Sequence, residues 1–245
     1  MKHQAAGTAA AGTPAIEVEG VTRRFGSRWV LRGVDLRVDQ GGVLALTGRN
    51  GSGKTTLLRI LATLLQPSRG TVRIFGEDAL THPDAVRERL GFLAHNPGIY
   101  DDLNADENLA FAQRMSRQSA DPARRAEVLA RVGLVDAGRE RVRGFSTGMR
   151  RRLALGRILL RPPTLLLLDE PYASFDADGI ALVNEVARSV ADAGGAVVIA
   201  THDLDRAAGI MDTRAEIDDG VLVAVPITAR ADAHRTVLLA GSGGV

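Results

Sequence analysis

The sequence contains no cysteine in its 245 residues. Disulfides and thiolate metal sites are therefore excluded, which fits a protein of the cytosol. It also has no apolar run close to the ~20 residues that a membrane-spanning helix requires, so we expect any contact with a membrane to come through a partner. Residues 1–15 lack the leucine-rich segment of a signal peptide, and we predict that they form a disordered tail.

An excess of either charge is lacking as well. The 31 Lys and Arg residues against 29 Asp and Glu give a formal net charge of +2. This balance does not have the basic excess of a nucleic-acid-binding domain, and no nucleic-acid partner is expected. A hydrophobic content of 45% and a charged content of 24% are ordinary for a globular protein, and the length allows one large domain with an inserted lobe.

The chain does contain short apolar segments that alternate with helical patterns. Helices are predicted after residue 54, near 84–89 and over 177–192. Residues 103–161 carry helical patterns without a clear strand, and we predict a helical lobe over about 96–161, inserted in the core. The alternation predicts an α/β fold with a mostly parallel sheet covered on both faces. Strands are predicted at 16–21, 30–38, 43–47, 71–76, 90–94, 164–169, 196–201, 215–218 and 221–225, with a turn at Gly26–Ser27.

A glycine-rich loop follows the strand predicted at 43–47. Residues 48–55, GRNGSGKT, fit the phosphate-loop pattern G-x-x-x-x-G-K-[ST] between a buried strand and a helix. Glycines let successive N–H groups point at phosphate oxygens, next to the positive end of the helix dipole. Lys54 is predicted to bridge the β- and γ-phosphates, Thr55 to ligate Mg²⁺ and Thr56 to reach the α-phosphate. The other predicted phosphate-binding residues are Gly48, Asn50, Gly51, Ser52 and Gly53.

Two adjacent acids end the leucine-rich segment TLLLLDE. Uncompensated charge at the edge of an apolar core costs several kcal/mol, so a partner is expected. Asp169 is predicted to hold Mg²⁺ opposite Thr55, and Glu170 to polarise the water that attacks the γ-phosphate. A simple surface turn is the alternative, and the presence of a phosphate loop argues against it.

Four segments together resemble the ATP-binding cassette (ABC) ATPases: GRNGSGKTT, FSTGM at 145–149, LLLLDEP, and THD at 201–203. Their order and spacing match the family from about residue 16 to 225. The resemblance implies an α/β fold of the P-loop NTPase type, with an antiparallel N-terminal β part and a helical lobe, over residues 16–245. It also implies ATP and Mg²⁺ as cofactors and a head-to-tail homodimer with two ATP molecules at its interface.

The resemblance assigns roles outside the phosphate loop. Ser146 and Gly148 would contact the γ-phosphate bound by the other subunit, and Asp176 lies in the loop that would cross to that site. His202 would contact the γ-phosphate in its own subunit, as a catalytic residue with Glu170 and Lys54. Phe25 stands where the family stacks an aromatic ring on adenine, and a core aromatic is the alternative.

Two points stay open at this level. Arg150–Arg152 is either a solvated helix face or part of the ATP site. His95 stands where most of the family has glutamine, at the hinge between core and lobe. We hypothesise that His95 joins the Mg²⁺ shell and adds pH sensitivity, because imidazole accepts only when it is neutral. His95→Gln should then change the shape of the pH profile of ATP hydrolysis; an unaltered shape contradicts the pH-sensing part.

The predicted function is that of the ATP-hydrolysing subunit of a membrane exporter, on the cytoplasmic face beside a transmembrane permease subunit. HNPGIY and DEPYASFDADG are similar to the ATPase subunit of haem exporters for cytochrome c biogenesis, whereas GMRRRL also occurs in drug and lipid exporters. A soluble ABC ATPase of DNA repair or translation would carry heptads or two cassettes. A module without turnover would not need Lys54, Asp169, Glu170 and His202.

Overall fold

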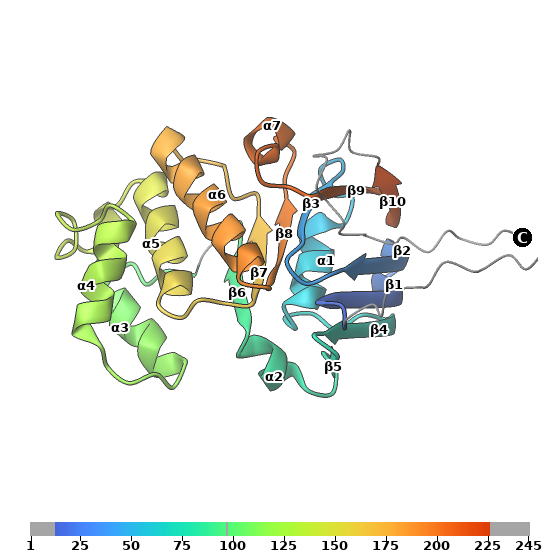
Figure 1. Cartoon of the computed structure of the whole chain (residues 1–245), viewed down its shortest axis with the longest axis horizontal. Helices are drawn as coiled ribbons and strands as arrows, with labels where there is room; N and C mark the ends of the chain where they lie inside the picture. Colours follow the sequence, from blue (N-terminus) through green and yellow to red (C-terminus); the bar gives the residue numbers. More distant parts are fainter. Residues whose placement is uncertain (1–12, 97, 226–245) are drawn as a thin grey trace, which may run out of the picture.

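The computed structural model describes residues 13–96 and 98–225. Two β-sheets and the helices around them make up this part of the chain (Figure 1). The larger sheet has six strands in the order β10–β9–β3–β8–β7–β6. Neighbours from β9 to β6 are parallel and β10 is antiparallel to β9, which confirms the predicted mostly parallel sheet. Its strands are β3 (Val43–Thr47), β6 (Leu90–Leu93), β7 (Leu165–Asp169), β8 (Ala196–Ala200), β9 (Thr213–Asp218) and β10 (Val221–Val225).

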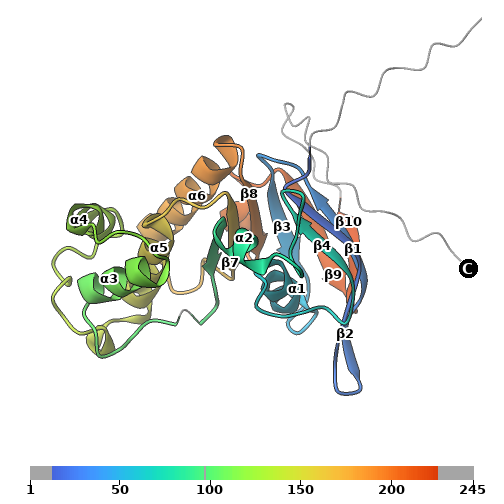
Figure 2. The same cartoon turned by 90° about the horizontal axis from the view of Figure 1, so that it is seen from below.

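The smaller sheet is antiparallel, in the order β2–β1–β4–β5. Its strands are β1 (Ile16–Phe25), β2 (Arg28–Val38), β4 (Arg69–Ile74) and β5 (Glu77–Asp78). The predicted turn at Gly26–Ser27 joins β1 to β2 in a hairpin that projects from the body (Figure 2). β1 runs past the predicted end at residue 21 because its polar second half pairs with β2 without an apolar face.

The larger sheet separates two apolar cores because successive side chains of a strand point to opposite faces. On β7, Leu166 and Leu168 belong to one core with helix α6 (Ala177–Asp192). Leu165 and Leu167 belong to the other core, with helix α1 (Lys54–Leu61) and the smaller sheet. Every residue of β3, β7 and β8 is buried, so these apolar runs are strands covered on both faces, as predicted.

Between β6 and β7 the chain forms a helical lobe at one side of the sheet (Figures 1 and 2). Its first helix begins at a capping box, in which Asn104 and Glu107 each accept the other's main-chain N–H at 2.8 Å. Leu109 and Leu155 are buried in the same core as α6, so the lobe packs on the sheet rather than forming a separate body. The lobe holds α3 (Ala105–Met115), α4 (Pro122–Arg131), the 3-10 turn η1 (Val142–Gly144) and α5 (Thr147–Leu159).

Two short helices complete the described fold, α2 (Pro83–Arg87) and α7 (Leu204–Ala207). The sequence predicts α2 and α6, whereas α7 and β5 are too short to leave a periodic pattern. Within the described ranges, no helix has both the length and the apolar character needed to span a bilayer.

The prediction of a disordered tail over residues 1–15 is wrong at Ala15. Its side chain is fully buried. Its N–H donates to the Val38 carbonyl at 2.9 Å, and its own carbonyl accepts the N–H of Phe75 at 2.9 Å. The ordered fold therefore starts before Ile16, because the main chain already pairs with β2 and with the end of β4. Residues 1–12 of that predicted tail, and residues 226–245 at the end of the predicted domain, lie outside the described residues.

Candidate active site

The phosphate loop turns the chain sharply between β3 and α1. Gly48 and Gly53 have φ values of 137° and 119°, which a residue with a side chain rarely adopts. A Cβ on Gly48 would lie 2.4 Å from the Ile217 carbonyl oxygen. Gly51, at the tip of the loop, also has a positive φ of 79°. The glycine spacing seen in the sequence is thus a steric requirement of this turn.

The start of α1 is open to an anion. Its N-cap is Gly53, which offers no side chain to the free N–H groups of the first turn. The Ser52 hydroxyl is buried and has no hydrogen-bond partner in the described structure. The Lys54 ammonium is buried beneath the loop and donates to the Gly48 and Arg49 carbonyls at 2.7 and 3.2 Å. Unpaired donors beside a buried cation fit the phosphates of ATP.

The structure brings Thr55 and Asp169 together, as predicted. The Thr55 hydroxyl donates to Asp169 Oδ1 at 3.1 Å, across 114 residues of chain. Asp169 is 1% exposed. Burial raises the pKa of its carboxyl, and the hydrogen bond from Thr55 and the nearby His95 lower it in part. A buried carboxylate next to a hydroxyl fits a divalent cation, with phosphate oxygens completing the shell.

Glu170 and His202 also lie together. Glu170 Oε2 is 2.8 Å from His202 Nδ1. The main chain of Glu170 has a left-handed φ of 49°, and its N–H donates to the Ala200 carbonyl at 2.8 Å. The Glu170 side chain is 18% exposed and that of His202 is 72% exposed, so the pair faces solvent at the strand ends. A carboxylate held in this way can accept a proton from water.

The acid pair has a third partner, Arg151, for which the sequence left open a solvated helix face or a place in the ATP site. Arg151, on α5, is 4% exposed and donates to the main-chain carbonyls of Glu170 and His95 at 2.9 and 3.1 Å. Burial lowers the pKa of its guanidinium, whereas the charges of Asp169 and Glu170 raise it. The signal was the run of three arginines, because three successive helix positions span about 200° and cannot all face solvent. Arg151 is therefore not part of a solvated face.

The two flanking arginines behave differently. Arg150 pairs with Asp101, and Arg152 pairs with Asp176 at 2.5 Å. Asp176 also caps α6 by accepting the N–H of Gly179 at 2.9 Å, and both contacts lower the pKa of Asp176, that from Gly179 most.

The FSTGM segment starts α5. The Ser146 hydroxyl caps this helix by accepting the N–H of Met149 at 3.2 Å, and the helix begins at Thr147. A Cβ on Gly148 would lie 3.0 Å from the Ser174 carbonyl. Among residues 13–96 and 98–225, no hydrogen bond joins Ser146, Gly148 or Asp176 to the phosphate loop.

Phe25 lies on the exposed hairpin, so the alternative of a core aromatic is wrong. It is 47% exposed, and the Arg23 guanidinium lies 4.5 Å from the ring centre. Beside the phosphate loop a cavity of about 480 Å³ is lined by Trp29, Asn50 and Ser52 among others. Trp29 is a candidate binding residue that the sequence did not suggest.

His95 itself is exposed, with its main chain held by Arg151. In the described part of the chain, no cluster of three or more His, Asp and Glu side chains has the arrangement of a metal site. The predicted Mg²⁺ ligands are instead one hydroxyl, one carboxylate and one imidazole, from Thr55, Asp169 and His95.

Comparison with known proteins decides the family. The model of the family described as ABC transporter matches residues 31–173, which include the phosphate loop, FSTGM and the acid pair. The chain belongs to the ABC transporter family. It is the ATP-binding domain, an ABC-type ATPase, which confirms the resemblance and the predicted fold.

Relatives within the ABC family include proteins of drug resistance and proteins of cytochrome c biogenesis. The daunorubicin resistance ATP-binding protein DrrA3 of Streptomyces coeruleorubidus is 40% identical over 212 residues, covering 86% of this chain and 67% of that protein. The chain thus spans about two thirds of that relative. The cytochrome c biogenesis ATP-binding export protein CcmA of Methylococcus capsulatus is 39% identical over 188 residues, covering 76% of this chain and 91% of that protein. A solved ATP-binding subunit of an ABC transporter superposes with a TM-score of 0.77 at 25% identity. The match covers 86% of this chain and 90% of that subunit.

Proposed function

We propose that this chain is the ATP-hydrolysing subunit of a membrane exporter, bound at the cytoplasmic face of the membrane to a separate transmembrane permease subunit. One arrangement carries the proposal: the Thr55–Asp169 and Glu170–His202 pairs lie at neighbouring strand ends beside the phosphate loop. A magnesium-bound triphosphate and the water that attacks it require such groups side by side.

In this mechanism the loop N–H groups and the start of α1 bind the phosphates. Lys54 exchanges a loop carbonyl for oxygens of the β- and γ-phosphates, and Thr56 reaches the α-phosphate. Thr55 and Asp169, with His95, would hold Mg²⁺, whose charge offsets the negative charge on the phosphate oxygens. Phe25, or Trp29 beside the cavity, stacks on the adenine ring.

Glu170 acts on the attacking water. Its carboxylate accepts a proton from the water as oxygen attacks the γ-phosphorus and the bond to the β-phosphate oxygen breaks. His202 orients Glu170 through the 2.8 Å contact and also contacts the γ-phosphate.

Two copies of the chain complete the site. Ser146 and Gly148 on α5, and the loop at Asp176, are proposed to meet the γ-phosphate held by the partner subunit. The N-terminus of a 13-residue helix capped by a hydroxyl is suited to an anion. ATP would then close the head-to-tail homodimer and hydrolysis would release it.

Glu170→Gln tests the proposal. We expect turnover to fall by about 10²–10⁴-fold because the amide accepts no proton. ATP binding should persist, and the variant should elute as a dimer with Mg-ATP in size-exclusion chromatography. Glu185→Gln is the matched control, since Glu185 is an exposed acid that pairs with Arg131 on the surface. Undiminished turnover in Glu170→Gln would rule out this role for Glu170.

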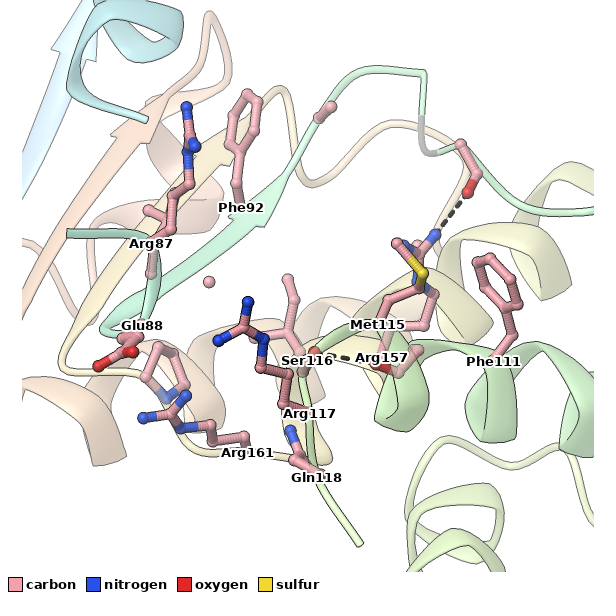
Figure 3. Close-up of a pocket in the computed structure, with 18 of the residues that line it drawn as sticks. Arg87, Glu88, Phe92, Phe111, Met115, Ser116, Arg117, Gln118, Arg157 and Arg161 are labelled. Atoms are coloured by element: carbon pink, nitrogen blue, oxygen red, sulfur yellow. Dashed lines mark hydrogen bonds between the residues drawn. The ribbon is translucent and has the colours of Figure 1, made fainter. Parts of the chain in front are cut away.

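The permease is proposed to dock in a groove between the sheet and the lobe. The groove has a volume of about 610 Å³ and is lined by α2, β6, α3 and α5. Phe111 and Met115 come from α3, Arg117 from the residues just after α3, and Arg161 from the residues just after α5 (Figure 3). Met115 is 68% exposed, so its apolar side chain is open to contact with a partner.

The charges of the groove define the segment that fits it. Among the described residues, neither Arg117 nor Arg161 has a hydrogen bond or ion pair through its side chain, whereas Arg87 pairs with Asp84 and Arg157 donates to the Gly98 carbonyl. The proposed occupant is a cytoplasmic segment of the permease that places an acid between Arg117 and Arg161 and an apolar side chain on Met115.

The proposed cargo is haem for cytochrome c biogenesis. HNPGIY, DEPYASFDADG and the match over 91% of CcmA support it. A drug exporter is the second candidate, supported by GMRRRL and by the 40% identity to DrrA3. The two differ in an ATPase assay of the chain co-purified with its membrane subunit: haem stimulates turnover in the first case, and daunorubicin in the second. Stimulation by neither compound contradicts both cargo assignments.

A further inference from the structure

Arg151 is the middle of three consecutive arginines, yet it is the one that turns inward. Its two terminal nitrogens each donate to a main-chain carbonyl, that of Glu170 at 2.9 Å and that of His95 at 3.1 Å. The partners lie 19 residues after it and 56 residues before it. One side chain on α5 therefore joins the loop after β7 to the segment after β6.

The carbonyl of Glu170 belongs to a strained residue. A left-handed φ of 49° is uncommon for a residue other than glycine and persists only when its surroundings fix it. At Glu170 the N–H is fixed by the Ala200 carbonyl and the carbonyl by Arg151. The peptide planes on both sides of the Glu170 Cα are thus held, which sets the direction in which the carboxylate leaves the main chain.

A buried guanidinium is an expensive way to hold two carbonyls. Taking a charge out of water costs several kcal/mol, and a well-packed apolar side chain is often as stable or more so. The planar fork of arginine, however, can donate to two separate oxygens in fixed geometry, which a lysine cannot do. The buried guanidinium of Arg151 is therefore better explained by the precise placement of the two carbonyls than by a gain in the stability of the fold.

We propose that Arg151 is a positioning residue for Glu170. It holds the main chain of the proposed water-activating acid, and the segment at His95, in a fixed place relative to α5, the helix that begins at Ser146. In the described residues, the Arg151 side chain donates to two main-chain carbonyls, so its proposed action is through the main chain. This inference rests on the role proposed for Glu170.

Two substitutions test it. Arg151→Lys keeps the charge and loses the fork, and Arg151→Met keeps the apolar stem and loses every donor. We expect kcat to fall about tenfold in Arg151→Lys and about 100-fold in Arg151→Met, with the Kd for ATP within about twofold of the original chain, because a misplaced base slows the chemical step. The matched control is Arg188→Lys: Arg188 on α6 also donates to a main-chain carbonyl, that of Ile210 at 3.1 Å. The control should lower Tm and leave kcat unchanged.

A double variant separates positioning from general damage. If Arg151 acts through Glu170, adding Arg151→Lys to Glu170→Gln should reduce the residual turnover no further. A kcat within twofold of the original chain in Arg151→Lys would overturn the proposal. So would a loss of ATP affinity as large as the loss of kcat, or a residual turnover in the double variant below that of Glu170→Gln alone. Should Arg151→Met fail to fold, the lysine variant and the double variant decide alone. If Glu170→Gln itself hydrolyses ATP normally, the role proposed for Glu170 fails, which is a different result.

Discussion

Asp169 and Glu170 raise the question of what compensates two acids at the end of an apolar strand. Within the chain the answer is partial. Thr55 donates to Asp169 and His202 contacts Glu170. Arg151 donates to the main-chain carbonyl of Glu170, and its positive charge interacts with both acids. Burial still leaves the pKa of Asp169 above its usual value. The charge that remains uncompensated at Asp169 is the one that a bound cation would neutralise.

This imbalance predicts the behaviour of Asp169→Asn. The folded state disfavours the ionised carboxyl, so the penalty exists at pH values above the folded pKa and disappears as pH falls below the unfolded pKa. Without nucleotide and with a chelator, the substitution should therefore raise Tm by about 2–4 °C at neutral pH, because it removes the charge and leaves an amide oxygen that still accepts from Thr55. The gain should shrink on acidification, and Mg²⁺-dependent ATP hydrolysis should be lost.

Thermal unfolding at neutral pH and at about pH 5, followed by calorimetry, measures the effect. Asp136→Asn, at an exposed loop position, is the control and should leave Tm unchanged. A lower Tm for Asp169→Asn at neutral pH would show that Asp169 stabilises the fold, contrary to the argument.

At the scale of elements, the strand β3, the phosphate loop and α1 form one unit whose geometry is local. β3 ends at Thr47 and α1 begins at Lys54, so six residues must reverse the chain and still point their N–H groups inward. The caps of α5 and α6 illustrate a second feature of this fold. Ser146 and Asp176 start these helices and are also the residues proposed to reach the partner's ATP. Substituting either should therefore affect both stability and activity.

Gly48→Ala tests the loop. The new Cβ would lie 2.4 Å from the Ile217 carbonyl oxygen and 2.7 Å from Ser52 Oγ, so the loop must move away from β9. We expect ATP affinity to fall at least about tenfold and the protein to lose about 1–3 kcal/mol of stability. Isothermal titration calorimetry and thermal unfolding measure the two effects.

Gly194→Ala separates backbone strain from the clash. Gly194 follows α6 and has a positive φ of 84°, and a Cβ there would meet nothing within 4 Å. It should lower stability by about 1 kcal/mol and leave ATP affinity unchanged. The steric account of the loop fails if Gly48→Ala binds ATP as tightly as Gly194→Ala does.

At the scale of the whole molecule, α5 links the two proposed working surfaces. Its first residues carry the FSTGM segment, Arg151 reaches the acid pair, and Ala154 and Arg157 line the groove proposed for the permease. The helix is buried along one side in the core shared with α6. A force applied in the groove would therefore act on a helix whose other end carries the residues proposed to meet the partner's ATP.

Arg161→Glu tests the groove. Reversing the charge should weaken co-purification with the proposed membrane subunit at least about tenfold, since the new carboxylate would repel the acid proposed for the permease segment. Basal ATP hydrolysis should stay unchanged because Arg161 lies outside the catalytic groups. Arg139→Glu makes the same charge change at an exposed site outside the groove and should not affect binding. Retained binding in Arg161→Glu, or an equal loss in the control, would contradict the proposed docking.

The sequence was sufficient wherever the determining interactions are local. The phosphate loop, the buried strand at 164–169 and helix α6 follow from glycine spacing, apolar runs and periodicity. The pairing of Thr55 with Asp169 also followed, since parallel strands bring their carboxyl ends to one edge of the sheet. The family followed as well, because its four segments are short and contiguous.

Tertiary structure alone decided the remainder. Nothing local distinguishes Arg151 from its neighbours, because its inward orientation depends on carbonyls 19 and 56 residues away. The same holds for Ala15, which is ordered by β2 and the end of β4, and for the groove, whose walls come from four separate elements. Local pattern thus determined which groups are proposed to bind and cleave ATP, whereas the packing of distant segments decided what holds those groups in place and which surface is open to a partner.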